Sequence, residues 1–275
     1  MAEKHKYPKL FWVSIGIFSF ICVVIFSFPA IFTQCGSIVD FTGTGQIGDT
    51  IGGIMGPFVA IGAAFLTFMA FWVQKEANDA QRRDIKVERF NNNFFNLLTL
   101  HEQITDALEL GTYVTESGES KFVVCKGRSV FYHAYKDAFE DDADVSFMGE
   151  GMQGRLKAQG LESYTESELP TYFDHYFRNM YRVVKYVDET DVFDDLPEKE
   201  RQDKKYEYVA ILRSTLSRYE LVWLFYNSLS VYGKDNFKPL VEKYAMLNNL
   251  RADLLVDSQH VKQYKAKAFG GKYPA

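Results

Sequence analysis

Two side chains that could act together on a phosphodiester lie five residues apart, Arg128 and His133. A histidine titrates near neutral pH and can move a proton as a general acid or base. An arginine beside it can bind the charged phosphate. The alternative interpretation is that Arg128 begins a helix and pairs with an acid, while His133 has no special role. The sequence leaves both interpretations open.

Four basic residues could form a contact surface for a nucleic acid or a protein partner. Arg178, Arg182 and Lys185 follow one another at i, i+4 and i+7, so they lie on nearly one face of a helix. Arg213 lies on the next predicted helix. Such cations bind phosphate, but they also form salt bridges to neighbouring acids. The net charge of −5 argues against a broadly basic, nucleic-acid-coating domain.

The chain lacks the motifs of several well-known enzyme classes. It has no G-K-[ST] phosphate loop, no nucleophile elbow, no H-E-x-x-H and no paired C-x-x-C. The three cysteines show no metal-ligand spacing. We therefore expect a protein that is not an enzyme, with no metal, no cofactor and no small-molecule substrate.

The elements that must position these residues begin with two uncharged stretches, Leu10–Phe32 and Ile51–Val73. About 20 apolar residues in a helix cross the ~30 Å hydrocarbon core, and lipid forces such a segment to be helical. Lysines precede the first stretch and basic residues follow the second, whereas the loop 33–50 contains none. This asymmetry predicts a two-pass protein with both termini cytoplasmic and the loop extracytoplasmic.

The second span begins with an unusual composition. Gly52, Gly56, Ala60 and Ala64 recur every four residues and form one stripe of small residues, which lets another helix approach closely in lipid. The approaching helix is either the first span of the same chain or a span of another subunit. Asp49, just before the stripe, either caps the second helix or places a charge at the mouth of a pore.

Beyond the membrane the apolar spacing is mostly helical. Residues 74–110 are predicted to continue the second span as a helical stalk, and 111–127 to contain a short hairpin. Helices are predicted over 128–139, 170–187, 198–232 and from 239. The fold class is therefore mainly α: a transmembrane helical hairpin over 1–73, a cytoplasmic all-α helical bundle over 111–256 with a small β-hairpin, and a basic tail over 257–275.

Several segments, in the same order, resemble the phage abortive infection (AbiC-like) two-span membrane proteins of bacteria. The matching segments are Gly45–Phe58, Gln74–Asn78, Phe94–His101, Gly127–Phe131, Tyr176–Asp188 and Tyr208–Ser230. The resemblance implies the bacterial inner membrane and a role in anti-phage defence. It also implies a defence-system partner such as a retron reverse transcriptase–nucleic acid complex. It supplies no catalytic residue.

Three functional hypotheses follow. The leading one is a membrane effector that oligomerises: its helical domain senses infection or is restrained by a partner, and its hairpins disrupt the inner membrane when activated. The second is a membrane-tethered ribonuclease, because Arg128 and His133 fit the Arg-x4-His pattern of the HEPN ribonucleases. The third is a non-toxic membrane adaptor of a defence complex.

Overall fold

The computed structural model describes residues 44–116, 119–139 and 173–273, together with separate helical residues between Trp12 and Ser27. Most of the predicted first span 10–32, and the predicted loop as far as residue 43, therefore lie outside the described residues. The chain divides into two compact units, Met1–Asp84 and Ile85–Ala275, and each is described by itself.

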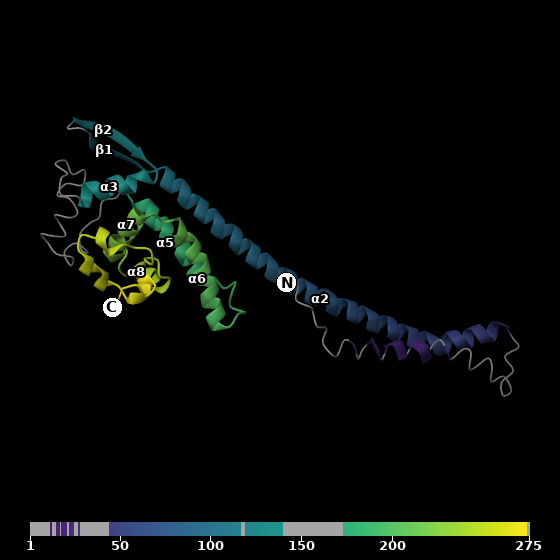
Figure 1. Cartoon of the computed structure of the whole chain (residues 1–275). Helices are drawn as coiled ribbons and strands as arrows, with labels where there is room; N and C mark the ends of the chain where they lie inside the picture. The colour runs from purple at the N-terminus through teal and green to yellow at the C-terminus, as the bar shows by residue number, and fades with distance from the viewer. Residues whose placement is uncertain are drawn as a thin grey trace. The chain divides into compact units, whose positions relative to one another are not determined.

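One helix, α2, runs without interruption from Thr44 to Asp106 (Figure 1). From Gly52 onward it is long and apolar enough to cross a membrane, and it is the only such helix among the described residues. Phe58, Ile61 and Phe68 are each more than half exposed. The helix starts earlier than predicted, so the last part of the predicted loop 33–50 is helical.

The predicted hairpin is confirmed as two antiparallel strands, β1 (Glu109–Glu116) and β2 (Glu119–Lys126). In this register Leu110 lies opposite Cys125, and both side chains are buried. Gly111 lies beneath the ring of Phe122, where an added Cβ would stand 2.5 Å from the ring Cζ atom. A larger residue at this position would therefore displace the ring.

The remaining described residues form the helical part of the second unit. Helix α3 (Ser129–Phe139) follows the hairpin, and then come α5 (Asp174–Asp188), α6 (Glu198–Thr215), α7 (Arg218–Leu229) and α8 (Lys238–Lys243). Three 3-10 turns follow at Ala252–Leu254, Ser258–Gln263 and Ala266–Phe269. The predicted apolar spacing of α5 is confirmed, because Phe177, Met180, Val184 and Val187 are all buried.

The predicted single helix over 198–232 is wrong, because the chain breaks between α6 and α7. Leu216 has an extended backbone, with ψ 128°. The Ser217 hydroxyl accepts a hydrogen bond from the Glu220 amide, and the Glu220 carboxylate accepts one from the Ser217 amide. This capping box starts a new helix. Ile211, which the one-helix pattern placed in the core, is 40% exposed.

The segment predicted as a basic tail packs into the core of the second unit as far as it is described. Tyr264 and Phe269 are buried, and the Leu247 amide donates to the Ala268 carbonyl at 3.0 Å. The lysines of this segment stay on the surface while its aromatic residues anchor it, as expected for amphipathic sequences.

Candidate functional site

Glu220 lies at the centre of a polar network inside the second unit. It belongs to the first turn of α7, and its side chain is only 1% exposed. The Tyr176 hydroxyl donates to its Oε1 at 2.8 Å, and the Ser217 amide donates to its Oε2 at 2.7 Å. The Arg128 Nε lies 3.3 Å from the same Oε2. A buried carboxylate is costly unless it is paired in this way.

His101 connects α2 to this network. The amide nitrogen of Asn179 lies 3.3 Å from its Nδ1, and its ring centroid is 4.5 Å from that of Tyr176. Burial, and then the charge of Arg128, lowers the pKa of His101 to about 4. Because an amide NH₂ can only donate, Nδ1 is the acceptor and the proton lies on Nε2. That Nε2 is the one buried side-chain nitrogen or oxygen without a hydrogen-bond partner in the described part of the chain.

Neither His101 nor Tyr176 changes its protonation near neutral pH. His101 is neutral there, since the pKa of its ring is far below 7. Burial, together with the charge and hydrogen bond of Glu220, raises the pKa of the Tyr176 hydroxyl well above its usual value. The network therefore has a structural role. It holds the end of α2 against α5, α7 and the residue before α3.

The two residues of the ribonuclease hypothesis have different surroundings. Arg128 is half exposed just before α3 and pairs with Glu220, as the alternative interpretation of the sequence has it. His133 is partly buried, and its ring packs edge-on against that of Tyr132 at 5.3 Å. The pairing of Arg128 with Glu220 does not favour the ribonuclease, which stays a hypothesis. No group of three or more His, Cys, Asp or Glu residues that could hold a metal occurs within the described ranges.

The four predicted contact cations have different surroundings in the structure. Arg178 and Arg182 are exposed on α5 and have no hydrogen bond or ion pair to another described residue. Lys185 lies 3.5 Å from a Glu189 carboxylate oxygen. Arg213 is used internally, because its guanidinium donates to the carbonyl of Ala245 at 3.0 Å. Two of the four thus have no hydrogen-bond or ion-pair partner among the described residues.

The small-residue stripe is exposed in the described structure. Gly52 and Gly56 have nothing within 4 Å of an added Cβ, whereas a Cβ added at Gly62 would lie 3.8 Å from a ring carbon of Phe18. Phe18 also stacks on Phe65, with ring centroids 6.2 Å apart. The described part of the first span therefore contacts α2 on a different face from the stripe, which includes Ala60 and Ala64, both exposed.

Asp49 lies inside α2, in its second turn, because the helix begins at Thr44. The backbone amides at a helix start are the ones that need a cap. Asp49 is therefore misplaced for the predicted capping role, and its side chain is exposed.

The sequence motifs pointed to Arg128 but not to Glu220, Tyr176 or Asn179 of the same network. The Ser-x-x-Glu spacing at 217–220 was the available signal for Glu220. Tyr176 and Asn179 lie on the apolar side of α5 and carry no motif of their own.

The comparisons with known proteins give one match. The family model described as "Putative phage abortive infection protein" matches residues 168–254, about a third of the chain. The matched part includes Glu220, Tyr176, Asn179 and all four predicted contact cations. The sequence resemblance is confirmed over these residues. Neither the search of curated proteins nor the search of solved structures found a match.

Proposed function

We propose that this chain is a membrane effector of phage abortive infection. In this proposal the second unit restrains the protein until infection or a partner releases it, and the apolar part of α2 then takes part in disrupting the inner membrane. The observation that carries the proposal is the single helix α2, which contains both an exposed apolar stretch and a buried, polar-anchored end. The matched family name supports the defence role.

The apolar stretch of α2 requires a cover that the described chain does not provide. Phe58, Ile61, Phe68 and Phe71 are each more than half exposed. Water is a poor solvent for so much contiguous apolar surface, which supports a bilayer or other membrane helices around it. The exposed stripe from Gly52 to Ala64 supports close packing with a second subunit in that bilayer.

The other end of α2 is held firmly. Phe90, Phe94, His101 and Thr105 are buried in the second unit, and the Tyr208 hydroxyl donates to Asn91 at 2.5 Å. A change in these contacts alters a helix that continues into the apolar stretch. Activation of this kind requires a trigger that binds one arrangement better than the other. Arg178 and Arg182 offer such a trigger an exposed basic surface within the family-matched segment.

A test of membrane action uses Phe58→Lys combined with Phe68→Lys. Each lysine at the centre of a span costs about 3 kcal/mol of insertion free energy. We expect the second span of the double variant to fail to insert and protection in a plaque assay to be lost. Gln74→Lys with Gln81→Lys adds the same charge beyond the apolar stretch and should keep both insertion and protection. Full protection by a double variant whose second span is not inserted would refute the proposal.

The adaptor hypothesis is separated by expression in growing cells. An effector released from its restraint stops growth of the host, whereas an adaptor does not. We expect overproduction without the neighbouring genes to be toxic, and co-expression of the restraining partner to relieve the toxicity. If the protein protects against phage and is not toxic at any of the expression levels tested, the adaptor hypothesis is favoured.

A further inference from the structure

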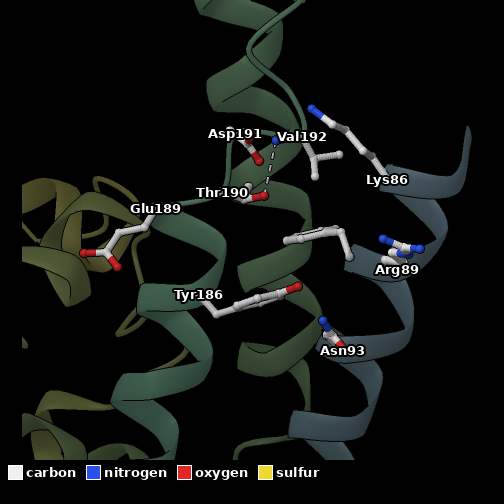
Figure 2. Close-up of a pocket in the computed structure, with 9 residues that line it drawn as sticks. Lys86, Arg89, Asn93, Tyr186, Glu189, Thr190, Asp191 and Val192 are labelled. Atoms are coloured by element: carbon white, nitrogen blue, oxygen red, sulfur yellow. Dashed lines mark hydrogen bonds between the residues drawn. The ribbon is translucent and has the colours of Figure 1, made fainter. Parts of the chain in front are cut away.

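A pocket of about 330 Å³ lies within the second unit, between α2 and the connection that follows α5 (Figure 2). Lys86, Arg89 and Asn93 line it from α2, and Tyr186, Thr190 and Asp191 face them. The volume is at the lower end of the range for small-molecule sites. The membrane function proposed above assigns this pocket no role.

One wall of the pocket carries two positively charged side chains. Lys86 and Arg89 are exposed, and neither has a hydrogen bond or ion pair to any residue that the structure describes. They are three residues apart on a helix, so their side chains leave the same face. Of the two acids in the lining, Glu189 lies 3.5 Å from Lys185. Two adjacent free cations favour an anion, and a phosphate can accept several hydrogen bonds from them.

The opposite wall offers acceptors. The Asp191 carboxylate is exposed and has no partner in the described ranges. The Thr190 hydroxyl accepts from the Val192 amide at 3.3 Å, which shapes the turn. A ligand that carries a hydroxyl or amino group at its far end can donate to Asp191.

The floor of the pocket is aromatic and fixed. Phe90 is 2% exposed and stacks on Tyr186, with ring centroids 5.2 Å apart and planes 10° from parallel. Asp188, just before the connection, accepts from the Lys243 amine at 2.6 Å and the Tyr244 hydroxyl at 2.5 Å. The turn is thereby held in place, so the pocket is formed before any ligand arrives.

We propose that this pocket binds a small phosphate-bearing molecule of the nucleotide class. The phosphate binds Lys86 and Arg89, the planar body lies against the partly exposed ring of Tyr186, and a hydroxyl or amino group donates to Asp191. A phospholipid headgroup shares the phosphate chemistry but has no planar body, so the floor favours a soluble nucleotide. Occupancy would brace α2 against the end of α5.

The test is equilibrium dialysis of the full chain in detergent with the four labelled ribonucleoside 5′-monophosphates. We expect saturable binding of at least one, weakened at higher salt because the contact is ionic. Lys86→Ala with Arg89→Ala should lower affinity at least tenfold. Arg82→Ala with Arg83→Ala makes the same charge change on the same helix away from the lining and should leave affinity unchanged. Circular dichroism establishes that both double variants fold.

Two further arms identify the ligand. Asp191→Asn should weaken nucleotide binding severalfold and leave competition by inorganic phosphate unchanged. Inorganic phosphate binding as tightly as the nucleotides would overturn the proposal. The proposal would also be overturned if nucleotides bound equally well to the Lys86→Ala, Arg89→Ala variant and to the Arg82→Ala, Arg83→Ala variant. If no nucleotide binds while binding to phosphatidylglycerol vesicles depends on Lys86 and Arg89, the ligand is a headgroup and the nucleotide proposal is wrong. Because binding is measured without infection, its failure is distinct from failure of the membrane function.

Discussion

At the scale of single residues, the interior of the second unit depends on how Glu220 is paired. Its partners come from three places in the sequence: Arg128, Tyr176 and Ser217. Helical periodicity indicates which residues of a helix face inward. It does not encode a pairing between residues 92 positions apart, such as Arg128 with Glu220. That pairing depends on the tertiary fold. The sequence therefore predicted that Arg128 could pair with an acid but did not identify the acid as Glu220.

Arg128 and His133 should differ in their effect on stability. Arg128→Ala leaves the Glu220 carboxylate buried without its cation, so we expect the free energy of unfolding to fall by about 1–2 kcal/mol, allowing for the half-exposed arginine. His133→Ala removes only ring packing and should stay within about 1 kcal/mol of the parent. Denaturant unfolding of the detergent-extracted protein measures both. The ribonuclease hypothesis would be restored by RNA cleavage in activated cells, provided that each substitution abolishes the cleavage without changing stability.

His101 should make stability depend on pH. Its pKa is about 4 in the folded protein and about 6.5 in an unfolded chain, so the unfolded state binds more protons between these values. Stability is therefore full above about pH 6.5 and falls as the pH drops toward 4, by up to about 3 kcal/mol. The difference in free energy of unfolding between the parent and His101→Gln should therefore become smaller as the pH falls from 6.5 toward 4.

The matched control for this pH dependence is His175→Gln, which changes an exposed histidine on α5. Unfolding curves at pH 7.5 and pH 4.5 give the comparison. An unchanged pH slope in His101→Gln would show that this ring does not titrate as the structure indicates.

At the scale of elements, α2 was the most predictable part and the α6–α7 break the least. The absence of proline and glycine between Gln74 and Leu110 predicted a continuous helix, and it ends at Asp106. The break at Leu216 was missed because apolar residues continue at helical spacing across it. A local capping box, whose contribution is about 1 kcal/mol, decided the boundary there.

Breaking α2 between its two functional ends should uncouple them. Asn78→Pro removes a backbone hydrogen bond and clashes with the preceding turn, at a cost of about 3 kcal/mol in an exposed helix interior. We expect loss of toxicity while the protein remains in the membrane fraction and the second unit keeps its melting transition. Asn78→Ala preserves the helix and should remain toxic. Toxicity in the proline variant would mean that the continuity of α2 is not used.

The small-residue stripe should be the surface on which membrane helices associate. Gly52→Leu with Gly56→Leu fills it with branched side chains, so we expect the native mass of the detergent-extracted complex to fall and toxicity to disappear. Ile54→Leu with Phe58→Leu changes two residues on the opposite face, about 200° and 240° around the helix from Gly52, and should alter neither. Persistence of the assembly in the double variant would place the subunit contact elsewhere.

At the scale of the whole molecule, hydropathy predicted an apolar helix for a membrane and a mainly helical polar part, and the structure agrees at that level. The pocket beside Lys86 was not predictable, because its two walls come from segments about 100 residues apart and neither carries a motif. The central claim about the molecule is that infection converts the restrained form into one that disrupts the inner membrane.

A potential-sensitive dye in infected cells tests this claim most directly. The measurement compares cells that express the parent chain with cells that express Gly52→Leu with Gly56→Leu at equal levels, in each case following dye fluorescence and growth from the moment of infection. We expect the parent to depolarise the membrane before growth stops and the double variant to leave the membrane potential unchanged. Growth arrest and phage protection with an unchanged membrane potential would contradict it.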